Sequence, residues 1–206
     1  MTRKQISCNF YPGCSIVCLT RILHEHPFEQ QIPKMPELVP VLKKEKIGAI
    51  VADIARKISK DYQNRELILI AVLKGAFVFV SDLMRHLDIQ AKVDFIGVSS
   101  YGAGTSSSEH VSITKEIHAD IKGKDVLVVE DIIDTGITLD FLLDYLRSKG
   151  PRSIKICTLL NKKERRKTDT KVDYIGFEVE KGFLVGYGLD FDEYYRNLPE
   201  IYHMKF

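Results

Sequence analysis

Residues 125–138 read DVLVVEDIIDTGIT, and this stretch decides how the rest of the sequence is interpreted. Its first part, Val126 to Val129, is an unbroken apolar run, which is typical of a parallel strand buried on both faces. Two adjacent carboxylates, Glu130 and Asp131, follow the run, and a short polar loop follows them. From Thr138 onward, leucines recur at helical spacing. The stretch therefore predicts a strand, an acidic pair, a loop and the start of a helix.

The order of these parts suits a ligand that carries both phosphate and hydroxyl groups. The loop contains Gly136 and leads into the helix, whose first N–H groups have no partner within the helix and therefore favour phosphate. Two carboxylates beside a phosphate would repel it, unless they hold sugar hydroxyls or a Mg²⁺ ion that the phosphate also binds. Because a ribose phosphate offers both groups, the stretch predicts a ribose-phosphate site.

The segment VVEDIIDTGIT resembles the motif that binds phosphoribosyl diphosphate (PRPP) in type I phosphoribosyltransferases. A lone Asp-Thr-Gly would be a weak signal, since aspartic proteases also contain it, but there the acid pair is not part of the pattern. The resemblance implies that Glu130 and Asp131 bind the ribose diol and Mg²⁺. It also implies that Asp134, within the nucleotide site, is the catalytic acid/base at N7 of the base. The 5′-phosphate would lie on Thr135, Gly136, Ile137 and Thr138.

Length and composition fit one globular domain. The chain has 206 residues, of which 45% are hydrophobic and 28% are charged, and its formal net charge is +2. A chain of this size can bury a substantial core. It contains no run of about 18 apolar residues, so no membrane span is expected. The near-neutral charge gives no overall sign of nucleic-acid binding.

Residues 1–40 are expected to form a poorly ordered N-terminal extension, and residues 41–206 the folded domain. Three of the four cysteines lie in the extension, followed by two histidines. A zinc site would use such groups, but their spacing differs from the paired C-x2-C pattern, and reduced thiols in a cytoplasmic protein are the simpler interpretation. Met35 lies just before the first clear helix. A translation start there is therefore a hypothesis, which N-terminal sequencing of the native protein would test.

Apolar patterns beyond residue 43 alternate between strand and helix. Apolar runs predict strands at 67–73, 93–98, 126–129, 153–160 and 172–179. Helical spacing predicts helices at 44–62, 76–87 and 138–150. This alternation predicts an α/β fold, with a mostly parallel twisted sheet flanked by helices. The resemblance specifies the type I phosphoribosyltransferase fold, which adds a small hood formed by the chain ends.

The turn after the strand at 67–73 contains Lys74 and Gly75. A lysine at the mouth of a buried strand is often simply solvated, and it is also where an open α/β sheet binds ligands. Leu73-Lys74-Gly75 resembles the family's pyrophosphate-binding loop, which has a non-proline cis peptide before the lysine. The resemblance therefore implies that Lys74 and Gly75 bind the pyrophosphate of PRPP.

A stretch of small polar residues follows the strand at 93–98. Composition alone predicts that Gly102 to Ser108 form a flexible linker. Ser100 and Tyr101, however, resemble the start of a loop that closes over the active site in the branch of the family that uses hypoxanthine and guanine. The resemblance therefore implies that these two residues contact the nucleotide and that the following loop is a lid.

Six of the eleven residues from 161 to 171 are basic. Such a run is most often a solvated loop, and a nucleic-acid patch is the second interpretation. The resemblance gives one member of the run a specific role, because Lys162 corresponds to the lysine that contacts the 6-oxo group of a purine.

The last segment completes the resemblance, which spans residues 41–203. Phe183 corresponds to the aromatic residue that stacks on the purine, and Leu184 to the residue whose backbone reads the edge of the base. Asp190 corresponds to a carboxylate near the purine and a second Mg²⁺ ion. Arg196 corresponds to a pyrophosphate contact. Five motifs in the same order, in the bacterial type of the family, are hard to explain by chance.

The resemblance implies a purine salvage enzyme that transfers the phosphoribosyl group of PRPP to N9 of hypoxanthine or guanine, giving IMP or GMP. Mg²⁺ would be required, and a homodimer or homotetramer in the cytoplasm is expected. An alternative is a regulator of the same fold that senses PRPP and binds RNA or DNA. A regulator would lack the base-binding side, so the presence of Asp134, Lys162 and Phe183 favours the enzyme and argues against a nucleic-acid partner.

Overall fold

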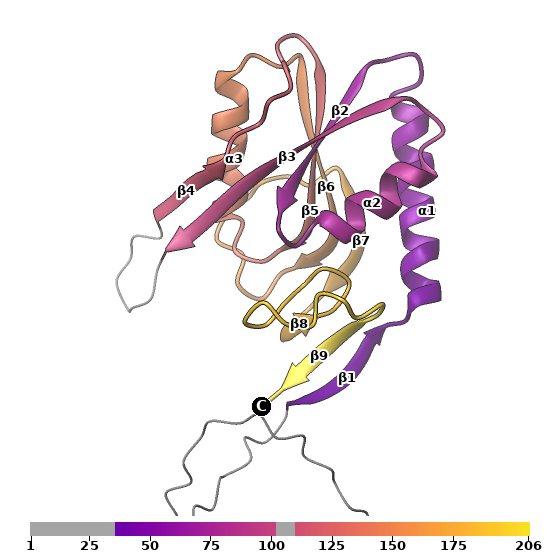
Figure 1. Ribbon diagram of the computed structural model, residues 1–206, viewed down its shortest axis with the longest axis vertical. Helices are drawn as coiled ribbons and strands as arrows, with labels where there is room; N and C mark the ends of the chain where they lie inside the picture. The colour runs from indigo at the N-terminus through magenta and orange to yellow at the C-terminus, as the bar shows by residue number, and fades with distance from the viewer. Residues whose placement is uncertain (1–35, 102–109) are drawn as a thin grey trace, which may run out of the picture. The chain divides into compact units, whose positions relative to one another are not determined.

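A computed structural model describes residues 36–101 and 110–206 (Figure 1). The N-terminal cysteines, the hypothesis about Met35 and the expected lid lie outside the described residues. No helix in the described ranges is long and apolar enough to cross a membrane.

A six-stranded sheet forms the centre of the domain, with strand order β4-β3-β2-β5-β6-β7. Its five parallel strands are β3 (Ala91–Tyr101), β2 (Leu67–Leu73), β5 (Asp125–Ile133), β6 (Ser153–Lys162) and β7 (Tyr174–Val179). At one edge β4 (His110–Lys115) pairs antiparallel with β3. The predicted mostly parallel sheet is therefore confirmed.

Helices cover both faces of this sheet (Figure 1). Helices α1 (Lys44–Asp61) and α2 (Phe77–His86) contact each other and pack on one face, where their apolar side chains form a core with residues of β2 and β5. Helix α3 (Ile137–Ser148) packs its leucines against the other face. Strand β2 and the first part of β5 are buried on both faces, and they accordingly consist of continuous apolar runs.

The chain ends build a second, smaller sheet. Strand β1 (Glu37–Leu42) pairs antiparallel with β9 (Ile201–Lys205), which also pairs with β8 (Phe183–Val185). This three-stranded sheet corresponds to the predicted hood. Because β1 begins at Glu37, the folded domain includes residues that the sequence prediction placed in the extension.

Two central strands are longer than their apolar runs predict. Strand β5 continues through the acid pair, because Glu130 pairs with Thr158 and Ile133 with Asn161 of the parallel strand β6. Strand β6 likewise continues to Lys162, which pairs with Val179 of β7. The acid pair and Lys162 therefore lie on strand ends and not in loops, so strand pairing fixes their backbone.

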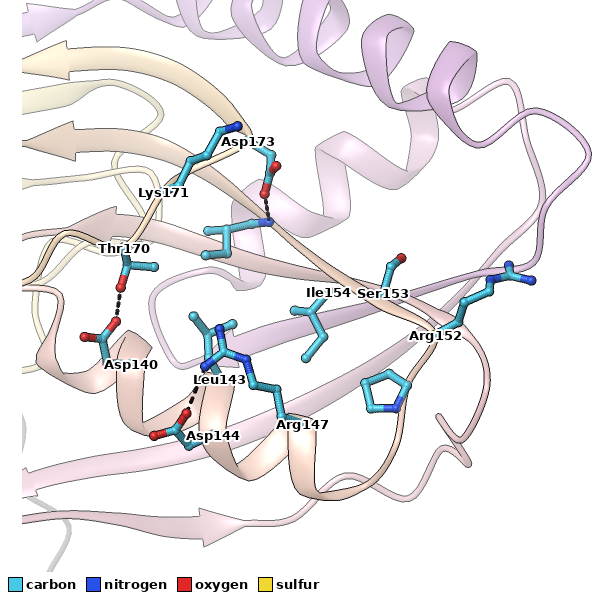
Figure 2. A pocket seen from close by; sticks show the side chains of 12 residues that line it. Asp140, Leu143, Asp144, Arg147, Arg152, Ser153, Ile154, Thr170, Lys171 and Asp173 are labelled. Carbon is cyan, nitrogen blue, oxygen red and sulfur yellow. Dashed lines mark hydrogen bonds and ion pairs between the residues drawn. The ribbon is translucent and has the colours of Figure 1, made fainter.

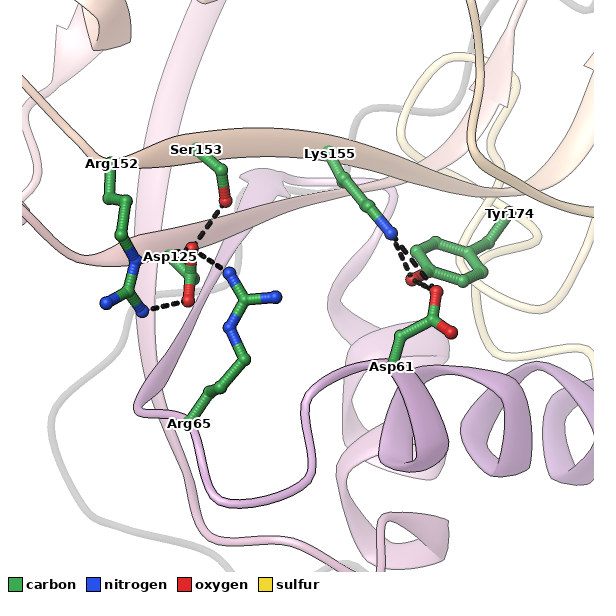
Figure 3. A network of polar contacts seen from close by, with 7 residues as sticks. All are labelled: Asp61, Arg65, Asp125, Arg152, Ser153, Lys155 and Tyr174. Carbon is green, nitrogen blue, oxygen red and sulfur yellow. Dashed lines mark hydrogen bonds and ion pairs between the residues drawn. The ribbon is translucent and has the colours of Figure 1, made fainter.

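Ion pairs hold the opposite end of the sheet, where the strands begin (Figure 3). Asp125, the first residue of β5, is buried and pairs with Arg152 and with Arg65, whose Nη2 lies 2.7 Å from its carboxylate. Nearby, the Tyr174 hydroxyl donates to Asp61 at the end of α1 at 2.6 Å. These contacts join α1 and the loop after it to β5, β6 and the start of β7.

Candidate active site

A cavity of about 230 Å³ lies at the carboxyl ends of strands β2, β3 and β5. Open α/β sheets bind their ligands at this end. The cavity brings together most of the residues that the sequence assigned to PRPP. Its lining includes Leu73, Gly75, Val98, Glu130, Asp131, Asp134, Thr135, Gly136 and Thr138.

The polar loop at the start of α3 has the geometry of a phosphate site. Gly136 is the N-cap residue of the helix and has a φ of 86°, a conformation that glycine adopts without strain. Its carbonyl accepts the first helical bond, from the N–H of Asp140 at 3.0 Å. The N–H groups of the first turn consequently lie at the cavity, where they can bind a phosphate.

The acid pair lies beside this loop. Burial raises the pKa of Glu130 well above its ordinary value, and the charge of Asp131 raises it further. Burial also raises the pKa of Asp131, to about 6. The turn after β2 packs directly on this pair, since a Cβ added to Gly75 would lie only 1.8 Å from Asp131 Oδ2. A side chain at position 75 would therefore have to displace the Asp131 carboxylate.

The acid pair fits the Mg²⁺ that the resemblance implies. Its raised pKa values reflect the cost of two buried charges, which a cation would offset. Mg²⁺ prefers oxygen donors and commonly binds through one or two carboxylates together with substrate phosphates. Residues 36–101 and 110–206 contain no cluster of three or more acidic, histidine or cysteine side chains that could hold a metal ion.

The peptide bond between Leu73 and Lys74 is cis, as the resemblance implied for the pyrophosphate loop. A loop of the hood, residues 186–196, packs on this turn. At Gly188 an added Cβ would lie 2.2 Å from the carbonyl oxygen of Gly75. Arg196 donates to the Gly188 carbonyl at 2.8 Å and pairs with Asp190 at 2.9 Å. The structure thus brings the hood cation Arg196 to the loop that carries Lys74.

On the other side of the cavity, Asp134 is surrounded by cations. Lys162 Nζ lies 3.7 Å from Asp134 Oδ1, and Arg165 Nη1 lies 3.5 Å from Oδ2. Only 8% of the Lys162 side chain is exposed, so this lysine is not a solvated loop residue. Among the described residues Asp134 Oδ1 is buried and has no hydrogen-bond donor. Within the described part of the chain, this oxygen thus has an unfilled hydrogen-bonding position.

The aromatic residue expected to stack on the base, Phe183, is 44% exposed at the start of β8. Its ring meets that of Phe191 at 5.6 Å and 88°, and that of Phe206 at 6.4 Å. The side chain of Leu184 is buried in the core. Sequence reasoning missed Phe191 and Phe206, because isolated aromatic residues in polar segments carry no pattern.

The basic run also lies against the site, along the phosphate loop. Arg166 donates to the side chain of Asn161 and to the carbonyl of Ile133, and the N–H of Lys167 donates to the carbonyl of Thr135 at 2.8 Å. Two threonines continue the contact. Thr168 packs on Gly136, and Thr170 donates to Asp140. We call residues 165–170 the strap; no pattern in the sequence predicts that it lies here.

Ser100 and Tyr101 lie at the end of β3, and the structure describes only their backbone. A larger cavity of about 660 Å³ contains none of the predicted site residues. It lies between α3 and β6, where Arg147 pairs with Asp144 and Thr170 donates to Asp140, as Figure 2 shows.

A parallel sheet with an acid pair and a phosphate loop at its carboxyl edge, under an antiparallel hood, is the arrangement of type I phosphoribosyltransferases. The chain belongs to the family described as the phosphoribosyl transferase domain, whose model matches residues 40–192. The resemblance inferred from the sequence is thus confirmed.

Individual relatives agree with this assignment. The chain is 49% identical over 166 residues to a hypoxanthine-guanine phosphoribosyltransferase of Aquifex aeolicus, covering 80% of this chain and 93% of the relative. Its identity to that of Bacillus subtilis is 45% over 165 residues, with coverages of 80% and 92%. A crystal structure of a hypoxanthine-guanine phosphoribosyltransferase from Bacillus anthracis superimposes with a TM-score of 0.76 at 44% identity, covering 82% of this chain and 99% of that one.

Proposed function

We propose that this protein transfers the 5-phosphoribosyl group of PRPP to N9 of hypoxanthine or guanine, producing IMP or GMP and pyrophosphate. The observation that carries this proposal is the pair of the buried Lys162 with the half-buried Asp134, which lines the cavity. The pair offers a donor to a 6-oxo group and an acceptor to the neighbouring ring nitrogen. The relatives' names support the same reaction.

PRPP would bind along the carboxyl edge of the sheet. Its 5′-phosphate would accept from the N–H groups of Thr135, Gly136, Ile137 and Thr138, and its ribose diol would bind Glu130 and Asp131. Lys74, Gly75 and Arg196 would hold the pyrophosphate, whose charge grows as the bond to C1 breaks. Mg²⁺, bound by Glu130 and Asp131 and in a second position near Asp190, would offset part of that charge.

The base would bind on the hood side of C1. Phe183 offers its exposed ring for stacking, and the backbone of Leu184 can read the edge of the base. Lys162 would donate to the 6-oxo oxygen, and Asp134 would accept the proton from N7 while N9 attacks C1. The hydrogen bond from Lys162 favours hypoxanthine and guanine over adenine, because a 6-amino group is itself a donor.

The loop that begins at Ser100 and Tyr101 would exclude water from the activated ribosyl group. Deleting residues 102–107 is expected to lower phosphoribosyl transfer steeply while the thermal unfolding transition remains. Near-normal turnover of the deletion variant would contradict a lid. A cytoplasmic location and a homodimer or homotetramer complete the proposal.

The test is to incubate the purified chain with PRPP, Mg²⁺ and, separately, hypoxanthine, guanine, xanthine and adenine, and to separate the products by chromatography. IMP and GMP are expected from the first two bases. If no base yields a nucleotide, the proposal is wrong and a PRPP-sensing regulator becomes the better explanation.

A further inference from the structure

Glu193 lies between the two cationic side chains that the proposed function assigns to pyrophosphate. Its Oε2 accepts from Lys74 Nζ at 2.8 Å and lies 3.4 Å from Arg196 Nη2. One carboxylate oxygen therefore contacts both cations, although Lys74 and Glu193 are 119 positions apart in the sequence. Sequence reasoning assigned Glu193 no role.

The Glu193 carboxylate is chemically similar to the pyrophosphate that Lys74 and Arg196 are proposed to bind. A carboxylate and a pyrophosphate both present anionic oxygens to ammonium and guanidinium donors. Glu193 and pyrophosphate consequently compete for the same donors.

The backbone of Glu193 is fixed, whereas its side chain can be displaced. The N–H of Glu193 donates to Asp190 Oδ2 at 2.9 Å, and Asp190 is itself paired with Arg196. The side chains of Lys74 and Glu193 are 65% and 62% exposed. Ion pairs between such exposed groups contribute little to stability, so a ligand of higher charge can replace the carboxylate.

We propose that Glu193 exchanges with pyrophosphate on Lys74 and Arg196. Before PRPP binds, the carboxylate keeps the two cations side by side. After the transfer, it competes with pyrophosphate for them and promotes its release. Glu193 is thus a positioning residue for the leaving group, and this inference rests on the proposed function.

The test is a calorimetric titration of the full-length chain with inorganic pyrophosphate in the presence of Mg²⁺ at fixed ionic strength. Glu193→Gln removes the charge and keeps the size of the side chain, and Glu193→Ala removes the carboxylate entirely. Both variants are expected to bind pyrophosphate more tightly than the wild type, by about twofold to fivefold, which is the range that an exposed ion pair supplies. A residue with a purely structural role would weaken binding when replaced.

The chain offers a matched control in Glu66, which also bridges two cations, Lys92 and Lys124. It precedes β2 at the opposite end of the sheet, so Glu66→Gln is expected to leave the affinity for pyrophosphate unchanged. Weaker or equal binding by both Glu193 variants would overturn the exchange while leaving the proposed function intact. If the wild type itself binds no pyrophosphate, both the proposed function and the exchange are wrong.

Discussion

Asp134 is the single residue on which the proposed chemistry depends most. It lines the cavity between the phosphate loop and Lys162, and its Oδ1 has no hydrogen-bond donor within residues 36–101 and 110–206. A general base must be able to accept a proton directly from its substrate. The sequence placed Asp134 in the motif, but the cations around it come from β6 and the strap and could not be read from local pattern.

Asp134→Asn is expected to lower kcat by about 10²-fold or more, because an amide cannot accept the N7 proton. The affinity for PRPP should stay close to that of the wild type, since other residues are proposed to contact the 5′-phosphate and the pyrophosphate. Steady-state kinetics with a direct measurement of PRPP binding checks both points. An unimpaired rate would overturn the assignment of Asp134.

Gly75→Ala tests the close contact between the pyrophosphate loop and the acid pair. The added methyl group would lie 1.8 Å from Asp131 Oδ2, so it must displace that carboxylate. We expect kcat/KM for PRPP to fall by about 10²-fold, as misplacement of a binding group by about 1 Å can cause. Gly48→Ala on α1 is the control, because nothing lies within 4 Å of its added Cβ. Equal activity of the two variants would contradict the packing argument.

Among the elements, the strap gives the basic run a structural explanation. Two of its backbone and side-chain contacts reach the carbonyls of Ile133 and Thr135, on either side of Asp134. The strap thus supports the loop between β5 and α3, and one of its charged side chains, Arg166, contacts the backbone there. This arrangement disfavours the interpretation of the whole run as a nucleic-acid patch.

Arg166→Met removes the side chain that links the strap to Ile133 and Asn161. Because the phosphate loop then loses support, KM for PRPP is expected to rise about tenfold. Lys163→Met is the control, since the one ion pair of Lys163 among the described residues is with Glu178 on the surface, at 2.7 Å, and surface pairs contribute little. Initial-rate measurements would contradict a supporting role if the two variants behaved alike.

At the other end of β5, Asp125 anchors the sheet electrostatically. Its side chain is fully buried, and hydrogen bonds from Arg152, Ser153 and Arg65 lower its pKa to about 2. The folded chain therefore binds fewer protons at this site than the unfolded chain. The stability that Asp125 supplies is complete above about pH 4 and is lost as the pH falls from about 4 towards about 2.

Asp125→Asn is expected to lower the free energy of unfolding at pH 7 by about 2 kcal/mol and to reduce its fall between pH 4 and pH 2. Urea unfolding across that pH range measures both effects. Asp53→Asn serves as a control, because Asp53 is exposed and, in the part of the chain that the structure describes, pairs with Arg56 and Lys57 of its own helix. An unchanged pH dependence in Asp125→Asn would show that the buried pair contributes no stability.

How much of each element the sequence could predict depends on where its stabilising contacts come from. Strand β2 matches its predicted bounds, 67–73, because the strand is one apolar run buried on both faces. Such a run can be recognised from the sequence alone. Strands β1, β4 and β9 were not predicted: they are short, carry mixed residues and are stabilised by distant partners, as in the pairing of Glu37 with Lys205. The contact between Lys74 and Glu193 could not be predicted for the same reason, because the two residues are distant in the sequence and come together only in the folded chain.

For the molecule as a whole, the hood links the two ends of the described fold. The first residue of β1, Glu37, pairs with Lys205 of β9. Removal of residues 1–34 would therefore leave every described strand pairing intact. Removal of residues 1–43 also deletes β1 and the buried side chain of Leu42. The hood, and not the preceding segment, is therefore expected to be essential for base binding.

A chain that begins at Met35 is expected to retain the melting temperature and turnover of the full-length chain. A chain that begins at Lys44 is expected to melt at a lower temperature and to bind the base weakly, because β9 loses a partner. Thermal unfolding and kinetics of the two truncations check this. Loss of activity in the chain that begins at Met35 would show that the preceding residues take part in function.

The central claim is that a phosphoribosyl-transfer site is paired with a site that recognises a 6-oxopurine. Its most direct test is the ratio of kcat/KM for hypoxanthine to that for adenine, measured at saturating PRPP and Mg²⁺. A site that hydrogen-bonds the 6-oxo group through Lys162 is expected to give a ratio of at least about 10³. Comparable values for the two bases, or no nucleotide from either, would contradict the claim.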